Sequence, residues 1–179
     1  MAKIKAGDFV VPQKLVTISE SQVEVPATQQ ITHIQFRRFS SCPICNLHID
    51  TFIKRHLELV QAGIQEVVVF HSTQDEMLKY GGDFPFAMIA DPQKQLYKSF
   101  GVESSILSVI NPVVWAPAVT GLIKFKQLPY EKGQSFFGLP ADFLIAKTGE
   151  VLAVKYGNHA DDHWEVDDVL QLSRQSAIA

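Results

Sequence analysis

Cysteine is scarce in this sequence. The 179 residues include two cysteines, which excludes the dense disulfide framework of small secreted proteins. The N-terminus carries two lysines but reaches Gly7 and Asp8 before any apolar core, so we expect no secretory signal. The protein is then expected in the cytoplasm, where a close cysteine pair is more often catalytic or metal-binding than a structural staple.

Clustered positive charge is also lacking. The formal net charge is -3, and the longest basic run is Arg37-Arg38, so we expect no nucleic-acid partner. Residues 104–123 carry no charge, but Pro112 and Pro117 fall within them. Two backbone breaks would be costly in lipid, so we expect no membrane partner and interpret this segment as a buried or lid-like insertion.

The chain length suits one domain, and the alternation of strand and helix patterns predicts an α/β protein. We expect a single domain over 1–179, with an N-terminal β extension at 1–31 and an apolar, helical insertion at about 103–137. The strand, helix, strand order between 32 and 70 predicts a right-handed βαβ unit. Predicted strands cover 14–19, 21–26, 32–39, 66–70, 84–92 and two segments of 141–157, and predicted helices cover 43–62, 72–80, 93–101 and 164–175.

Both cysteines lie in the stretch FRRFSSCPICNLHI, as Cys42 and Cys45. The stretch joins a predicted strand to a helix that begins at Pro43, a residue that suits the first helical position. Free N–H groups and the dipole at a helix N-terminus stabilise a thiolate. We therefore expect Cys42 to be the outer nucleophile with a lowered pKa, and Cys45 to be a more shielded thiol that resolves its adducts.

Several neighbours are candidates for supporting this pair. Arg37 and Arg38 lie on a predicted strand, where side chains alternate, so at most one of them is near the cysteines. Ser41 and its neighbour Ser40 could cap the helix or donate a hydroxyl hydrogen bond. The supporting residues expected from the sequence are Ser41, Pro43 and Arg38.

A metal site is the principal alternative for the two cysteines. His159 and His163 have H-x3-H spacing and would complete a Cys2His2 set, and His48 and His71 are further candidates. A helix that begins at Pro43, between the cysteines, favours dithiol chemistry instead. We therefore expect no metal and no cofactor.

Three stretches together resemble a known family: FRRFSSCPICNLHI, FPFAMIADPQKQLYKSFGVE and GLPADFLIAKTGEVL. They are similar to the thioredoxin-like superfamily, and within it to the peroxiredoxin-like branch of the alkyl hydroperoxide reductase/thiol-specific antioxidant group. The resemblance covers about 32–172, with a divergent insertion between 103 and 137. It implies a central mixed sheet with helices on both faces. It also implies that Pro140 is a cis-proline facing the dithiol, with Leu139 against the substrate.

The sequence departs from this family at its peroxide-reducing motif, P-x-x-x-T/S-x-x-C. Counted back from Cys45, the two conserved places hold Cys42 and Arg38; counted back from Cys42, they hold Phe39 and Gln35. The family's arginine before the late strand is missing as well. Peroxide cleavage needs donors for the developing charge on oxygen, so thiol–disulfide exchange is the safer expectation.

Three hypotheses follow. The first is a thiol–disulfide oxidoreductase that acts on a protein or small-molecule disulfide with a glutathione- or thioredoxin-type reductant. The second is an atypical thiol peroxidase that reduces hydrogen peroxide or organic hydroperoxides. The third is a non-catalytic binding module of the same fold, with a metal at the cysteines. The apolar insertion would suit a homodimer.

Overall fold

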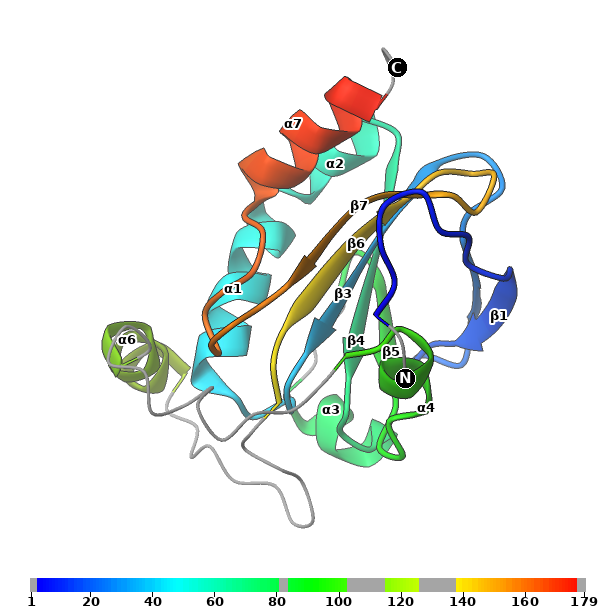
Figure 1. Ribbon diagram of the computed structural model, residues 1–179. Coiled ribbons are helices and arrows are strands. Elements are labelled where there is room, and N and C mark those ends of the chain that lie inside the picture. The colour runs from blue at the N-terminus through cyan, green and yellow to red at the C-terminus, as the bar shows by residue number, and fades with distance from the viewer. Residues whose placement is uncertain (1–2, 81–83, 103–114, 126–137, 177–179) are drawn as a thin grey trace.

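A five-stranded mixed sheet forms the centre of the computed structural model, which describes residues 3–80, 84–102, 115–125 and 138–176. The strand order is β5-β4-β3-β6-β7 (Figure 1). Strands β3, β4 and β5 are parallel, whereas β6 is antiparallel to both β3 and β7. The strands are β3 (Ile31–Arg37), β4 (Ile64–Phe70), β5 (Ala87–Ala90), β6 (Ala141–Ile145) and β7 (Val151–Tyr156). This is the mixed sheet that the family resemblance implied.

The predicted βαβ unit is present, but its helix is divided. Helix α1 (Pro43–Lys54) and helix α2 (His56–Gln61) are separated at Arg55. The Arg55 guanidinium binds Glu58 and also Asp167 of the C-terminal helix, each at 2.7 Å. Gly63, with φ of 70°, follows α2 in the left-handed conformation that glycine adopts most readily.

Helices cover both faces of the sheet (Figure 1). Helices α1, α2 and α7 (Val166–Ser176) pack their apolar side chains on one face. Helix α4 (Gln95–Ser99) and the N-terminal segment pack on the other. Helix α3 (Gln74–Tyr80) follows β4 and contributes Met77 to the cluster around α1. The predicted N-terminal β extension is an antiparallel hairpin of β1 (Gln13–Val16) and β2 (Gln22–Val25).

Helix α6 (Trp115–Phe125) is the described part of the predicted insertion; the rest of 103–137 lies outside the described residues. It rests on α1 through small residues. Ala118 packs against the cluster that contains both cysteines, and a Cβ on Gly121 would overlap the carbonyl oxygen of Pro43. Lys124 also binds Asp50 of α1 at 2.6 Å.

The outward face of α6 is apolar. Its large side chains are exposed, from 40% for Leu122 to 70% for Ile123, with Trp115 and Val119 between these values. The helix therefore turns small residues inward and large apolar residues outward, the reverse of an ordinary surface helix. None of the described helices has the length and apolar character needed to cross a membrane.

Gly121→Ala should destabilise the packing of α6 on α1. A helical glycine normally gains stability on replacement by alanine, but here the added Cβ would meet backbone atoms of Pro43. Overpacking of this kind costs about 1–3 kcal/mol. Urea unfolding, with amide hydrogen exchange of α6 as a local readout, measures the effect. Thr120→Ala, on the exposed side of the same helix, is the control. A stabilised Gly121→Ala protein would show that the contact is not tight.

Candidate active site

The two cysteines occupy the N-terminus of α1 as the sequence predicted. Cys42 is the N-cap, with extended backbone angles, and Pro43 is the first helical residue. The Cys42 Sγ accepts a hydrogen bond from the backbone N–H of Cys45 at 3.3 Å. A sulfur thus takes the place usually held by a serine or aspartate oxygen at an N-cap. Neither Ser40 nor Ser41 is the N-cap of this helix.

Arg38 is the arginine that reaches the cysteines. Its Nη2 donates to the Cys42 Sγ at 2.9 Å, and the residue is only 4% exposed. Arg37 points away from the pair and binds Asp142 on β6. The prediction that at most one of the two arginines lies near the cysteines is confirmed.

Both thiols are buried, which the sequence did not predict. Cys42 is fully buried and Cys45 is 3% exposed, so the expected contrast between an outer and an inner thiol is wrong. Their apolar cluster includes Phe39, Ile44 and Met88, with Ala118 of α6 packed against it. Apolar cover on several sides removes water from the sulfurs and strengthens electrostatic contacts with them.

One negative charge is shared by the pair. Burial raises the pKa of the Cys42 thiol, and the adjacent Cys45 raises it further. Burial acts in the same direction on Cys45, but the hydrogen bond from Cys42 and the charge of Arg38 outweigh it and lower the pKa of Cys45 to about 5. The expectation of a lowered pKa on Cys42 itself is therefore wrong. The pair loses its first proton easily and holds its second strongly.

The segment before β6 also touches this site, through Gly138. A Cβ on Gly138 would lie 3.2 Å from Arg38 Cγ and 3.3 Å from His71 Nε2, so glycine lets the backbone approach the arginine closely. Leu139, half-buried, and Pro140, buried, follow directly. Gly138 carried no motif, and the sequence analysis missed it.

Pro140 is not a cis-proline, so that prediction is wrong. Among the described residues the cis peptide bond is Val25–Pro26. The Pro140 carbonyl accepts a hydrogen bond from Gly157 N at 2.9 Å, and its ring packs against Gly157. Pro140 therefore acts as a strand-start proline that leads the chain into β6.

The backbone just before the N-cap is fixed by side chains of other elements. Ser72 Oγ accepts a hydrogen bond from Ser40 N at 2.8 Å, and the Asn46 side-chain amide donates to Ser40 O at 2.8 Å. Ser41 is fully buried between this anchored residue and the N-cap. The approach to Cys42 is thus held by both α1 and the loop after β4.

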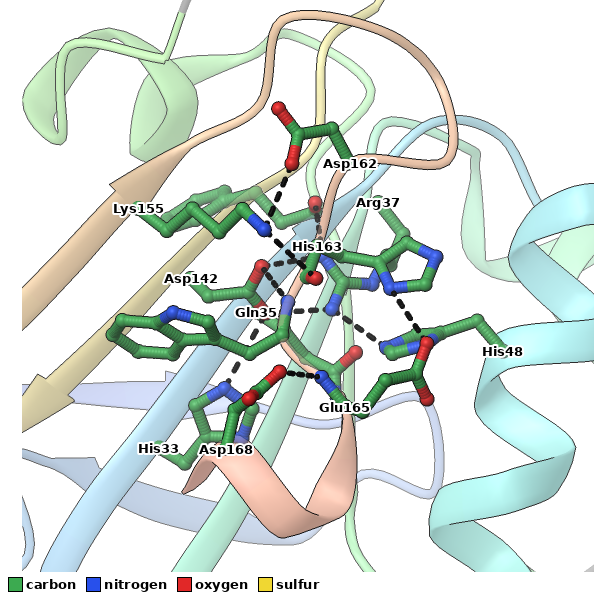
Figure 2. A network of polar contacts seen from close by, with 12 residues as sticks. His33, Gln35, Arg37, His48, Asp142, Lys155, Asp162, His163, Glu165 and Asp168 are labelled. Atoms are coloured by element: carbon green, nitrogen blue, oxygen red, sulfur yellow. Dashed lines mark hydrogen bonds and ion pairs between the residues drawn. The ribbon is translucent and has the colours of Figure 1, made fainter. Parts of the chain in front are cut away.

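A row of buried charges lies beneath α1 (Figure 2). Asp142 receives Arg37 Nη2 at 2.6 Å and lies 3.3 Å from His33 Nε2. His33 Nδ1 is 2.7 Å from Glu66, whose other oxygen accepts from Gln35 at 2.6 Å. All five residues are at most 2% exposed. Basic and acidic groups alternate along the row, so each charged group has an opposite charge beside it, which buried ionised groups require.

These contacts control how the buried groups ionise. Burial alone would lower the pKa of His33, but Glu66 and Asp142 raise it to about 9. Burial would raise the pKa of Asp142, but Arg37 and His33 hold it well below its ordinary range. Asp142 is thus an ionised counter-charge and not a proton acceptor for the thiols.

His48 joins this row to the C-terminal segment. Arg37 Nη2 lies 2.8 Å from His48 Nε2, and because arginine can only donate, Nε2 is the acceptor and the ring proton is on Nδ1. Burial, and then the charge of Arg37, keep the pKa of His48 well below normal. Its ring lies 3.6 Å from that of His163, measured between centroids.

In the part of the chain that the structure describes, His48, His163 and Glu165 are the set whose potential metal-ligand atoms lie within 4.8 Å of one another. This set includes neither cysteine, and a metal-binding histidine normally donates its second N–H to an acceptor. His48 instead faces the Arg37 donor, so its Nδ1 keeps a proton and is a poor ligand. The arrangement fits a positioning role for His48 better than a metal site.

The structure thus brings Cys42, Cys45, Arg38 and Pro43 together, as the sequence predicted, and adds Gly138. The sequence analysis missed the charged row, although a polar pattern along β3 indicates it. His33, Gln35 and Arg37 alternate with Ile34 and Phe36 along a central strand, and a polar face on a strand covered from both sides indicates a buried network.

The stability of the protein should fall as the pH rises from about 6.5 to 9. The raised pKa of His33 stabilises the fold fully below pH 6.5, by roughly 3 kcal/mol, and this contribution is lost as the pH passes through 9. Urea unfolding of a Cys42→Ser/Cys45→Ser protein, which removes thiol titration, measures the slope. His33→Gln in that background should be less stable at pH 7 and flat over this interval. An unchanged slope in His33→Gln would contradict the assignment.

Comparisons with known proteins agree with this fold. Peroxidoxin BcpB from Mycobacterium tuberculosis matches with a TM-score of 0.70 at 16% identity, over 96% of this chain and 97% of that one. Plasmodium vivax 2-Cys peroxiredoxin in its reduced form matches with a TM-score of 0.68 at 14% identity, over 98% and 83%. A candidate thiol:disulfide interchange protein DsbE from Chlorobium tepidum matches at 0.61 and 17%, over 99% and 100%.

At these identities the structural matches show the thioredoxin-like fold alone. No curated protein sequence matches the chain. The family model described as AhpC/TSA antioxidant enzyme matches residues 51–159, more than half of the 179 residues and entirely after the two cysteines. The protein therefore belongs to the AhpC/TSA antioxidant enzyme family, and is an oxidoreductase with a thioredoxin-like fold.

Proposed function

We propose that the protein is a thiol–disulfide oxidoreductase in which Cys42 attacks and Cys45 resolves. The observation that carries this proposal is the hydrogen bond from Arg38 to the N-cap sulfur of Cys42. Two donors, the Arg38 guanidinium and the Cys45 N–H, are directed at the same sulfur. They stabilise negative charge on Cys42 whenever the shared proton moves to Cys45.

The reaction needs no group beyond the dithiol and its substrate. The Cys42 thiolate attacks a disulfide RSSR′, forming a Cys42–SR bond and releasing R′S⁻. Cys45 then gives its proton to the released thiolate and attacks the Cys42 sulfur, which closes the Cys42–Cys45 disulfide and releases RS⁻. Two electrons pass from the protein to the substrate.

Pro43, Ser41 and the 138–140 segment support this reaction in the proposal. Pro43 fixes the start of α1, and Ser41 holds the buried turn before the N-cap. Gly138 contacts Arg38, so a substrate bound along Leu139 and Pro140 would lie next to the arginine. The substrate is then a protein or small-molecule disulfide that must displace part of the apolar cover.

An atypical thiol peroxidase is the second candidate, and Arg38 favours it too. A donor beside the reactive sulfur can stabilise charge on a departing peroxide oxygen, the task of the arginine that is missing before β6. The Cys42 thiolate would take one oxygen from ROOH, giving a sulfenic acid and, with one proton, ROH. Attack by the Cys45 thiol would then form the disulfide and release water.

The oxidised protein then needs a reductant, for which a glutathione- or thioredoxin-type thiol is the proposed partner. The exposed apolar face of α6 is the surface that we propose for a homodimer, because exposed apolar patches of this kind mark interaction sites.

Separate replacement of the two cysteines tests the roles. Cys45→Ser should react with one equivalent of an aromatic disulfide and keep a stable mixed disulfide, visible by intact mass. Cys42→Ser should react at least about 100-fold more slowly, because it lacks the sulfur that receives both donors. Stopped-flow mixing with hydrogen peroxide, under the same conditions, separates the peroxidase from the exchange enzyme.

The opposite pattern would contradict the proposed roles. If Cys42→Ser formed the adduct and Cys45→Ser did not, then Cys45 would be the attacking sulfur. If the unmodified protein formed no reversible disulfide with either oxidant, the oxidoreductase proposal would fail, and a binding role would remain.

A further inference from the structure

The two adjacent arginines have different counter-charges. Arg37 binds the carboxylate of Asp142, which keeps its charge whatever the redox state. Arg38 is also buried, and its guanidinium contacts the dithiol, whose one shared negative charge exists only while the pair is reduced. Closing a Cys42–Cys45 disulfide therefore removes a charged contact from Arg38 but leaves Arg37 unaffected.

This difference favours the reduced state. In a buried site, a guanidinium 2.9 Å from one sulfur of a pair that carries a negative charge interacts with that charge strongly. The disulfide sulfur is neutral and a weak acceptor, so oxidation loses most of this interaction. Interactions that stabilise the reduced form of a dithiol make its disulfide a stronger oxidant.

We propose that the Arg38–Cys42 contact sets the direction of the reaction, so that the protein's disulfide is a strong oxidant that takes electrons from partner dithiols. This inference rests on the proposed function and runs its exchange steps in reverse: electrons pass from a partner dithiol to the protein, which specifies the favoured redox direction and the substrate class. In the favoured step the protein's disulfide and a partner dithiol R(SH)₂ give the partner disulfide R(S–S), one protein thiolate, one protein thiol and one proton. A hydroperoxide, or a disulfide of higher potential, must then regenerate the oxidised protein.

The number of protons released on reduction shows whether the reduced pair carries a negative charge, so it tests this inference. Reduction by glutathione releases one proton if the product is a thiolate–thiol pair, and none if it is a dithiol. Among the described residues, Arg38 and Tyr97 of α4 interact electrostatically with the pair, and His71 after β4 lies beside Gly138, which contacts Arg38. Burial raises the pKa of Tyr97 well above its ordinary value, so it stays neutral at the pH values used here.

The test is the equilibrium of the full chain with reduced and oxidised glutathione, followed by intact mass at several pH values. In the unmodified protein the constant for reduction should rise tenfold per pH unit between 6 and 8. In Arg38→Gln it should fall about a hundredfold at pH 7 and become nearly independent of pH. Arg38→Lys keeps the positive charge and should recover most of the loss, which a merely structural role would not predict.

A second measurement needs no variant. The reduced protein should unfold at a higher temperature than its disulfide form, although a disulfide normally stabilises the folded state. An oxidised form that is more stable than the reduced form, or an Arg38→Gln equilibrium that matches the unmodified protein, would overturn the inference. In that case the cysteine replacements above would still decide the proposed function, because they measure adduct formation and not potential.

Discussion

Two consecutive arginines must be buried at the end of the central strand, and the rest of the site depends on how each is compensated. Strand alternation sends Arg37 beneath α1, where it binds Asp142 and reaches His48. It sends Arg38 to the opposite side, where it binds the N-cap sulfur of Cys42. A buried guanidinium needs partners of this kind, because leaving its charge uncompensated would cost several kcal/mol, so these contacts have a structural role before they have any chemical one.

The two compensations are linked through α1. Arg37 contacts His48, one helical turn after Cys45, so the same helix is fixed to the sheet by one arginine and bears the sulfur that meets the other. Any shift of α1 along β3 would disturb both contacts. The buried row of charges therefore helps to specify the position of the thiols, although a buried ion pair by itself is weak evidence for stability.

Local signals in the sequence predicted a large part of this architecture. Period-two alternation predicted the hairpin and β3, a continuous apolar run predicted β4, and Pro43 with the cysteine spacing placed Cys42 at the N-cap. The division of the helix at Arg55 was not predicted: no glycine or proline marks it, and the Arg55 side chain there binds Asp167, more than a hundred residues later. For the same reason the sequence did not show which side of β6 bears Asp142, or that its pairing with Arg37 removes it from proton transfer.

The prediction that Cys42 is exposed was wrong for a different reason. A helix N-terminus is usually open to solvent, and nothing local to the CPIC motif predicts that Ala118 of a distant helix packs against the cysteine cluster. The conformation of Pro140 is likewise set in a tertiary environment, where its carbonyl accepts a hydrogen bond from Gly157 and its ring packs against that residue. Family resemblance was reliable for the mixed sheet with helices on both faces and less so for these individual residues.

The family match and the thiol site are independent lines of support. The matched segment begins at residue 51, so it covers most of the scaffold and none of the cysteine turn. Evidence for the chemistry comes instead from the geometry of residues 37–45. Because the matched segment does not include the cysteines, the redox scaffold and the charged, buried dithiol support the same function independently.

The cover over the thiols has a kinetic consequence. Cys42 and Cys45 expose almost no surface, so an oxidant can meet them only after the surrounding cluster has moved. At high oxidant concentration the observed rate would reach the rate of that movement and stop depending on the reagent. Reagents of very different intrinsic reactivity would then converge on one limiting rate constant, and the enzyme would choose its substrates by what opens the cover and not by how strongly they oxidise.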